Sequence, residues 1–379
     1  MSQLITGAGA VVSVGDDIDE IFRALCAGTT GLAGLRGFDR TRYRTRNAYE
    51  IDDRPGDGDV PGRATAWLLR AVEQAAEQAG LGDDLSGVPI LVGTGLRELR
   101  SIELAHRDGA DFGLDRLHFG TALRERFGAA RTYTFSGACS ASLYALAMAS
   151  DLIASGAEDH VVVAGVDTLT ESMYGLLDRV HMDPPERVQP FDRDRRGVLM
   201  GDGAAAVVLR RETPEAARGA LGRLRAVSMN CDAHHVTAPD PEGIAEAVRD
   251  AQRQAGVKPG DIDLVLLHGT GTLLNDEAEA TAIAEVFGTD VTAPLMTAIK
   301  SMTGHTSGSA GLVSLIVALR AMASGRVPPT VGLADPVDEA AGFRFATGRV
   351  EGADIGVAQI DAFGFGGVNA VAIVERAGR

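Results

Sequence analysis

The chain has 379 residues, a net charge of −16 at neutral pH, 45% hydrophobic and 23% charged residues. This length exceeds the usual about 100–200 residues of one domain, so two domains or one large composite domain are expected. The acidic balance argues against nucleic-acid binding, which needs a basic surface that displaces counterions.

The sequence predicts neither a targeting segment nor a membrane span. The first seven residues lack a basic region and their apolar run ends at a glycine, unlike a signal peptide. The apolar stretch 312–322 is interrupted by Ser314 and Arg320 and is shorter than the about 20 residues that a bilayer requires. We therefore expect a cytoplasmic protein without membrane contact.

Short aliphatic runs alternate with longer alanine-rich amphipathic stretches along the chain. This pattern predicts an α/β fold in which helices cover both faces of a sheet. The expected strands are 89–92, 132–135, 160–166, 204–209, 264–268 and 369–374. The expected helices are 61–79, 140–155, 244–255, 276–287 and 307–323.

The two halves of the sequence end alike. A glycine-rich turn leads into an apolar run at 201–209 and again at 364–374. A boundary after residue 211 divides the chain into two similar α/β halves, 1–211 and 212–379. Such a duplication predicts a site between the halves, with residues drawn from both.

Of the three cysteines, Cys139 has the sequence context of a nucleophile. It follows an expected strand and a turn of small residues, and it begins an expected helix. Unpaired N–H groups and the dipole at a helix N-terminus stabilise a thiolate, although a buried cysteine more often serves as a small hydrophobe. Cys26 and Cys231 lie in contexts that suggest inert thiols, and the spacing of the three indicates no disulfide or metal site.

Three further motifs combine small residues with groups that can carry chemistry. One is His268-Gly-Thr-Gly-Thr272, the second is Lys300-Ser-Met-Thr-Gly-His305, and the third is the turn 363–367 of glycines and phenylalanines. Each has a structural explanation when taken singly: a buried histidine, a helix cap with a solvated lysine, and a hairpin turn.

Together, and in this order, the four motifs resemble those of the β-ketoacyl synthases of the thiolase superfamily. The resemblance extends over nearly the whole chain, because 4–9 is similar to the opening strand and turn of that family, and 190–197 with 201–203 to its mid-chain motif. It implies a duplicated thiolase-like fold of five layers (αβαβα). It also implies a discrete synthase of the fatty-acid or type II polyketide kind.

The resemblance implies roles for five residues in decarboxylative Claisen condensation. Cys139 would accept an acyl chain from the phosphopantetheine thiol of an acyl carrier protein. His268 and His305 would assist decarboxylation of malonyl-carrier protein by donating hydrogen bonds to the enolate. Lys300 and Glu279 would be the charged pair that organises these histidines. No metal and no cofactor of the protein's own are expected, since phosphopantetheine arrives on the carrier.

The same resemblance assigns residues to substrate binding. Thr270 and Thr272 would bind the pantetheine arm. Phe365 would be the gating aromatic, and its backbone N–H, together with that of the cysteine, would form the oxyanion hole. Phe363 and Gly366 of the same turn would line the substrate site.

The sequence departs from the family pattern in two places. Gly95 is followed by Leu-Arg-Glu-Leu-Arg, and the segment from there to the cysteine, which in relatives builds the dimer contact and pocket floor, is short. Val198 stands near the malonyl entrance, where relatives often have phenylalanine. Acyl-chain length and the choice between a homodimer and a heterodimer with a homologous subunit therefore stay open.

An acidic carrier protein requires a local basic patch for docking on this acidic chain. The candidate residues, which could equally be ordinary surface charges, are Arg124, Arg126, Arg131, Arg195 and Arg196.

Alternatives to condensation also stay open. An acyltransferase on the same fold would use Cys139 without decarboxylation, and the two histidines with Lys300 favour condensation over it. A non-catalytic partner subunit would typically lack the cysteine. Thiolases and initiating synthases use a different residue set around it.

Overall fold

Two sets of strands with the same pairing order form the centre of the molecule. The computed structural model describes residues 3–54, 56 and 58–378. The N-terminal set has the order β5-β4-β6-β7-β1 and consists of β1 (Gln3–Val12), β4 (Ile90–Thr94), β5 (Thr132–Ser136), β6 (His160–Asp167) and β7 (Gly203–Arg211). The C-terminal set has the order β11-β10-β9-β12-β13-β8 and consists of β8 (Gly222–Cys231), β9 (Leu264–Leu266), β10 (Leu295–Thr297), β11 (Arg344–Phe345), β12 (Val357–Gly364) and β13 (Val368–Arg376).

The repeated order confirms the predicted duplication. If β11 is left out and the strands of each half are numbered from 1 to 5 along the chain, the strand order across the sheet is 3-2-4-5-1 in both halves. The directions repeat as well, because β1 is antiparallel to β7 as β8 is to β13, and β4 is parallel to β6 as β9 is to β12. Pairing of β1 with β8 joins the two sets into one 11-stranded sheet. A separate small ribbon pairs β2 (Ala33–Gly34) with β3 (Asn47–Ala48).

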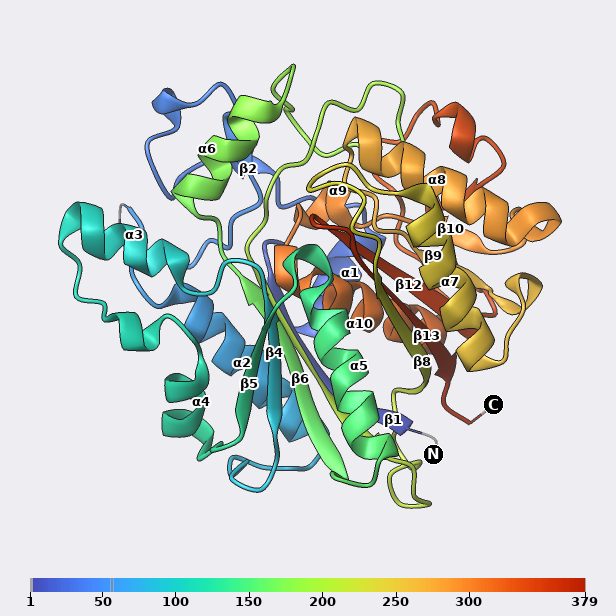
Figure 1. Ribbon diagram of the computed structural model, residues 1–379, viewed down its shortest axis with the longest axis horizontal. Helices are drawn as coiled ribbons and strands as arrows, with labels where there is room; N and C mark the ends of the chain where they lie inside the picture. Colours follow the sequence, from blue (N-terminus) through green and yellow to red (C-terminus); the bar gives the residue numbers. More distant parts are fainter. Residues whose placement is uncertain (1–2, 55, 57, 379) are drawn as a thin grey trace.

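Helices separate and cover the two halves of the sheet, which gives the predicted five layers (Figure 1). Helices α5 (Ala141–Ala154) and α10 (Ala310–Ser324) lie between the halves, since α5 contacts β4 and β8, and α10 contacts β7 and β12. On the outer faces, α2 (Arg63–Gln78) packs on β1 and β7, and α7 (Pro241–Ala255) packs on β8 and β13 beside α8 (Leu273–Phe287). The other α-helices are α1 (Ile18–Cys26), α3 (Leu99–Asp108), α4 (Gly120–Phe127), α6 (Glu171–Val180) and α9 (Lys300–Thr303).

The position of each helix explains its composition. The two central helices are apolar around most of their circumference because a sheet covers them on both sides, whereas α2 and α7 have one polar face toward solvent. The window 307–324 around α10 is apolar and long enough to cross a membrane by length and composition, but 83% of it is buried inside the fold. It is therefore explained as a core helix.

All six expected strands and five expected helices form, with ends shifted by a few residues. One shift matters for the site. The strand expected at 264–268 ends at Leu266, so His268 lies in the loop beyond it.

Strand β4 approaches the start of α5 so closely that only glycine fits at residue 93. A Cβ atom there would lie 2.4 Å from the backbone of Ala141 and Ser142. We predict that Gly93→Ala lowers the free energy of unfolding by about 3 kcal/mol, the upper part of the range for overpacking, because backbone atoms cannot rotate away. Denaturant unfolding would measure this, with Gly87→Ala as control, since a Cβ there meets nothing within 4 Å. Equal stability of the two variants would contradict the prediction.

Candidate active site

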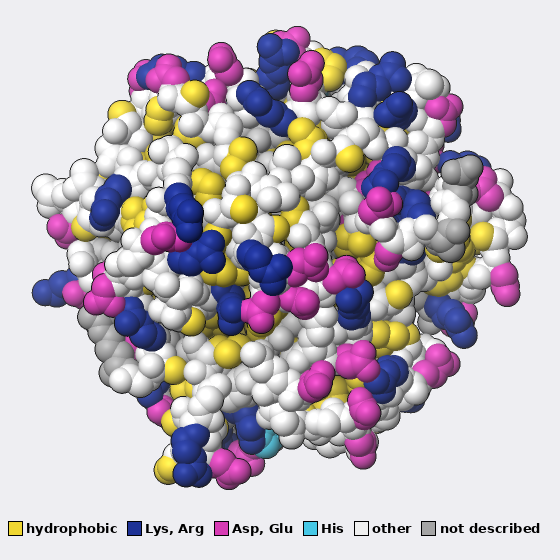
Figure 2. Space-filling view, turned by 180° about the vertical axis from the view of Figure 1, so that it is seen from behind, with side chains coloured by type: hydrophobic (Ala, Val, Ile, Leu, Met, Phe, Trp, Pro, Cys, Tyr) yellow, Lys and Arg dark blue, Asp and Glu magenta, His cyan; other side chains and the backbone are white. Residues whose placement is uncertain are grey.

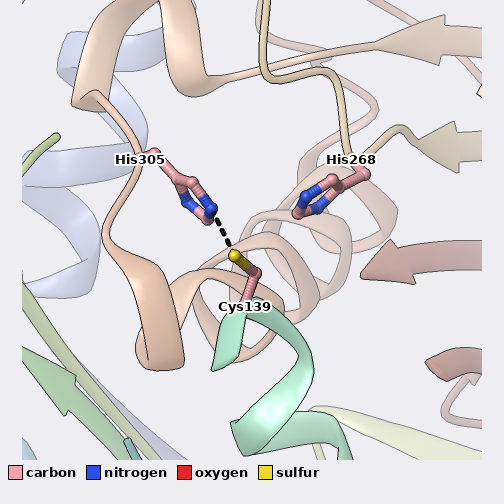
Figure 3. Close-up of side chains that lie close together, drawn as sticks. All are labelled: Cys139, His268 and His305. Carbon is pink, nitrogen blue, oxygen red and sulfur yellow. Dashed lines mark hydrogen bonds between the residues drawn. The ribbon is translucent and has the colours of Figure 1, made fainter. Parts of the chain in front are cut away.

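One cysteine and two histidines from separate motifs meet between the two halves of the molecule (Figure 3). His305 Nε2 lies 2.9 Å from Cys139 Sγ, and the imidazole rings of His268 and His305 are 5.4 Å apart between centroids. The cysteine comes from the N-terminal half and both histidines come from the C-terminal half. The duplication therefore places the site between the two halves, with residues drawn from both.

A strained turn presents the cysteine. Cys139 lies in the short 3-10 turn η3 (Ala138–Ser140) between β5 and α5, and Ala138 has a φ of 47°. A non-glycine residue in this left-handed region costs about 1–3 kcal/mol, so surrounding contacts must hold it. The Ser140 hydroxyl does so, because it donates to the carbonyl oxygens of Gly137 and Val368, each at 3.0 Å.

Burial controls the charge of the thiol. It raises the pKa of Cys139 to about 11, whereas Lys300 and the backbone N–H of Phe365 lower that pKa. The position of Cys139 at the start of a helix predicts a stabilised thiolate. In the folded protein, loss of solvent outweighs that effect, so the free site holds a neutral thiol.

The hydrogen bonds of His305 define its tautomer. The backbone N–H of Ser307 donates to His305 Nδ1 at 3.3 Å. Because a backbone N–H can only donate, Nδ1 is the acceptor and Nε2 carries the proton. Residue 304 must be glycine for this loop to form, since its φ is 67° and a Cβ would lie 2.6 Å from the ring of Tyr49.

Lys300 defines the tautomer of His268 in the same way. Its Nζ lies 3.3 Å from His268 Nδ1 and also bonds the carbonyl oxygen of His268. An ammonium donates only, so the proton of His268 is on Nε2. Glu279 holds the backbone of the same loop by accepting the N–H groups of His268 and Gly269 at 2.6 and 2.8 Å, and the Phe363 ring packs 5.7 Å from the imidazole.

Both imidazoles are neutral. Burial lowers the pKa values of His268 and His305 well below the usual range, and the positive charge of Lys300 lowers them further. The site therefore presents two neutral N–H donors to a group beside the thiol. Burial also lowers the pKa of Lys300 and raises that of Glu279. The negative charge of Glu279 partly offsets the lowering at Lys300.

The threonines of the second motif lie at the start of α8. Thr270 Oγ1 and Thr272 Oγ1 are 2.9 Å apart, and Thr272 caps the helix by accepting the N–H of Asn275. Asp276 fixes this loop, because its carboxylate accepts the N–H groups of Thr270, Gly271 and Phe191.

The turn between β12 and β13 places the backbone of an aromatic residue beside the cysteine. Phe365 is 47% exposed, and its backbone N–H bonds the sulfur of Cys139. Gly366 is exposed and its N–H donates to the carbonyl oxygen of Val236 at 2.8 Å. The structure thus brings Phe363 and Phe365 to the site, whereas the hydrogen bonds of Gly366 are to Val236 and Cys231. The substrate roles of all three residues stay predictions. Val198 is buried in a cluster with residues of α6.

The predicted basic patch is not formed as a group. Arg195 is 4% exposed and bonds the carbonyl oxygens of Thr272 and Leu273 and the carboxylate of Glu277, so its assignment to the docking surface is wrong. Its charge instead stabilises the N-terminal loop of α8. On the face opposite to that in Figure 1, basic and acidic side chains are interspersed (Figure 2).

Three of the other arginines lie at the far end of β5 from the cysteine. Arg131 directly precedes this strand, whereas Cys139 follows it, and Arg131 pairs with Glu158. Arg126 is exposed and pairs with acidic residues, and Arg124 is exposed on the same helix, α4. Arg196 is exposed and lies on the segment that leads to residues 199–201, which bond the backbone of His305.

The three site residues could also be considered as metal ligands. One ligand atom from each of Cys139, His268 and His305 lies within 4.8 Å of the others, and this set of types suits zinc. The Lys300 ammonium, whose Nζ lies 3.3 Å from His268 Nδ1, opposes a divalent cation at this place. The charge distribution thus favours an anionic ligand.

Three buried carboxylates near the site were missed by sequence reasoning. Asp167 accepts N–H groups from Gly95, Leu96 and Gly308 and so ties the halves together beside the cysteine turn. The other two are Asp276 and Asp361, which are 0% and 2% exposed. A signal exists for Asp361, because it is an acidic residue inside an otherwise buried strand.

The duplicated fold, with a cysteine and two histidines where its halves meet, is that of the thiolase-like enzymes. Residues 4–215 match the family model for the β-ketoacyl synthase N-terminal domain, and residues 221–334 match the model for the β-ketoacyl synthase C-terminal domain. The chain therefore belongs to the β-ketoacyl synthase family, an acyltransferase class of enzymes.

Similar proteins span nearly the same length. The chain is 27% identical to 3-oxoacyl-[acyl-carrier-protein] synthase 2 of Coxiella burnetii, with 98% of each covered, and 29% identical to nodulation protein E of Rhizobium meliloti, with 97% of each covered. Among solved structures, the ishigamide ketosynthase/chain length factor matches with a TM-score of 0.89 and 29% identity, covering 100% of this chain and 99% of the other.

The chain's two lysines offer a matched test of the site's electrostatics. Lys300→Met removes the positive charge that lowers the pKa of the Cys139 thiol, so that pKa rises and the thiolate fraction falls. We predict that alkylation of Cys139 by iodoacetamide slows by about tenfold for each unit of the rise. Peptide mass spectrometry would measure the rate, with Lys258→Met, at the exposed lysine, as control. Equal rates in both variants would remove Lys300 from this role.

Proposed function

We propose that this chain catalyses decarboxylative Claisen condensation between a Cys139-bound acyl chain and malonyl-acyl carrier protein. The observation that carries the proposal is the pair of neutral imidazoles, His268 and His305, whose Nε2–H donors converge beside the thiol. An enolate oxygen needs such donors, because they stabilise its developing charge without consuming a proton. The product is a β-ketoacyl-carrier protein, as in fatty-acid or type II polyketide assembly, and we place the reaction in the cytoplasm.

The first step loads the enzyme. The sulfur of Cys139 attacks the carbonyl carbon of an acyl-carrier thioester, and the resulting oxyanion accepts the backbone N–H groups of Cys139 and Phe365. The bond to the carrier sulfur then breaks, and the carrier thiol leaves with the proton that the cysteine loses. The positive charge of Lys300 favours the thiolate that this step requires.

The second step forms the carbon–carbon bond. Loss of carbon dioxide from the malonyl group leaves its electron pair in an enolate, whose oxygen accepts hydrogen bonds from His268 and His305. The enolate carbon attacks the acyl group on Cys139, the carbon–sulfur bond breaks, and the thiolate takes a proton from solvent. Thr270 and Thr272 would hold the pantetheine arm, which the carrier supplies, so the scheme uses no metal and no cofactor bound to the chain.

The relatives support this reaction over simple acyl transfer. Proteins named 3-oxoacyl-[acyl-carrier-protein] synthase match along almost the whole chain. An acyltransferase that passes the chain to a hydroxyl would need a base to remove a proton. In the tautomers that their hydrogen-bond partners indicate, His268 and His305 present donors toward the thiol instead.

We also propose that the chain pairs with a second copy or a homologous subunit along β5. This strand is the last in its half of the sheet, and Tyr133 on it is 52% exposed. An edge strand with an exposed aromatic residue is a ready template for pairing. A ketosynthase/chain length factor among the similar structures supports the heterodimer as one of the two arrangements.

Intact mass would test the reaction in two stages. Incubation with an acyl-carrier protein should add one acyl group, and Cys139→Ala should abolish this addition because no other thiol lies beside the histidines. Subsequent malonyl-carrier protein should remove the acyl group and yield a carrier product longer by two carbons. Acylation without elongation, even with a candidate partner subunit present, would instead establish the acyltransferase.

Docking of the carrier gives a second test. We predict that Arg196→Glu raises KM for the carrier several-fold, by about 1 kcal/mol of binding free energy, with kcat little changed, because Arg196 is exposed on the segment leading to the site. Arg126→Glu, at the far end of β5, serves as control. A larger rise in KM for the control would move the docking surface to α4.

A further inference from the structure

A further buried carboxylate lies beside the loop that carries His268. Asp361 is 2% exposed and belongs to β12. This strand runs parallel to β9 with Ile360 opposite Leu266, so Asp361 lies next to the end of β9 from which the loop departs. The same strand continues to Phe363, whose ring packs on His268.

A chain of amides holds this carboxylate in place. Gln359 Nε2 donates to both oxygens of Asp361, at 2.9 and 3.3 Å, and Gln252 Nε2 donates to Gln359 Oε1 at 3.0 Å. Gln252 belongs to α7, so this side of β12 faces the layer of α7 and α8. These donors orient Asp361 but carry no charge, which leaves its charge to act on ionisable neighbours.

The charged neighbours come from two helices. Helix α8 contributes Glu279 and α9 contributes Lys300, and both interact electrostatically with Asp361. Asp276 of α8 in turn interacts with Lys300. The two carboxylates of α8 are engaged with backbone N–H groups of loops 268–271 and 191. Glu279 raises the pKa of Lys300 most strongly, and Asp276 and Asp361 add to this effect. Asp361 bonds a side-chain amide instead of a loop backbone, so its charge can be removed while the loops that the other two carboxylates hold stay in place.

We propose that Asp361 is a positioning residue for the condensation: its carboxylate adds to that of Glu279 in keeping Lys300 an ammonium as the pH rises, and the ammonium fixes His268 as an Nε2–H donor. This inference rests on the proposed function, because the donor matters only if an enolate forms. Burial raises the pKa of Asp361 to about 7 and lowers that of Lys300. Asp361 therefore becomes negatively charged in the pH range in which Lys300 begins to lose its proton.

The pKa changes of Asp361 and Lys300 determine which way the pH profile of Asp361→Asn shifts. At about pH 6 Asp361 is protonated, so Asp361→Asn resembles the wild type electrostatically. At higher pH only the wild type gains the negative charge that holds the proton on Lys300. In Asp361→Asn, Lys300 loses its proton earlier, and the basic limb of the profile of kcat/KM against pH moves down by about one unit.

The test compares pH profiles of condensation, from about pH 6 to about pH 9, for wild type, Asp361→Asn and Gln252→Leu. Gln252→Leu breaks the amide chain without changing charge, so we expect an even loss of rate with the midpoint unmoved. Coincident midpoints for wild type and Asp361→Asn would overturn the inference. If Asp361→Asn does not fold, Gln359→Leu replaces it. This variant removes the hydrogen bonds of Gln359 to Asp361 and so raises the pKa of Asp361, and we expect a smaller downward shift of the basic limb of the pH profile. An unmoved basic limb again overturns the inference.

A second readout does not need condensation. Because the ammonium lowers the pKa of Cys139, alkylation of this thiol by iodoacetamide at alkaline pH should be several-fold slower in Asp361→Asn than in wild type. A wild type that releases no carbon dioxide, together with this difference in alkylation, would reject the proposed function and keep the link from Asp361 to Lys300. Equal alkylation together with coincident pH profiles would reject that link while leaving condensation established.

Discussion

The ammonium of Lys300 contacts both the carbonyl oxygen and Nδ1 of His268, in a place that solvent does not reach. A buried cation of this kind is stable only among compensating carboxylates, and the fold supplies them from α8 and β12. Its position determines the tautomer of His268, adds to the burial that keeps both imidazoles neutral, and supplies part of the stability of the thiolate. The glycine-rich loops, buried acids and strand ends around it are arranged to keep that charge in place.

Two neutral donors are suited to a reaction that generates its own carbanion. Loss of carbon dioxide provides the electron pair, so the protein does not need a strong base but does need hydrogen bonds to the enolate oxygen. In the buried space between the two half-sheets these bonds are stronger than in water. The same burial disfavours the free thiolate, and this explains why Lys300 and the backbone N–H groups near Cys139 are needed.

The geometry also depends on backbone strain in the loops that carry the reactive groups. Ala138 precedes the cysteine with a φ of 47°, and Ser307 follows His305 with a φ of 49°. Each conformation persists because neighbouring segments of the other half hold it: the carbonyl oxygen of Val368 accepts from Ser140, and Asp167 accepts the N–H of Gly308. The contact between the halves is thus part of the catalytic apparatus and does not merely contribute burial.

The local sequence pattern determined the main elements of the fold and indicated the family. Hydrophobic periodicity predicted the main strands and helices, the similar ends of the halves predicted the duplication, and the order of Cys139, His268, Lys300 and His305 indicated the family. Tertiary structure alone decided the electrostatics. Arg195 turned out to be buried, the thiol pKa rises where a helix terminus alone would lower it, and Asp361 joined the charged cluster, because burial and the register of distant strands set these properties. A sequence shows which groups can ionise, but only the packed interior fixes how far each lies from water and from the other charges.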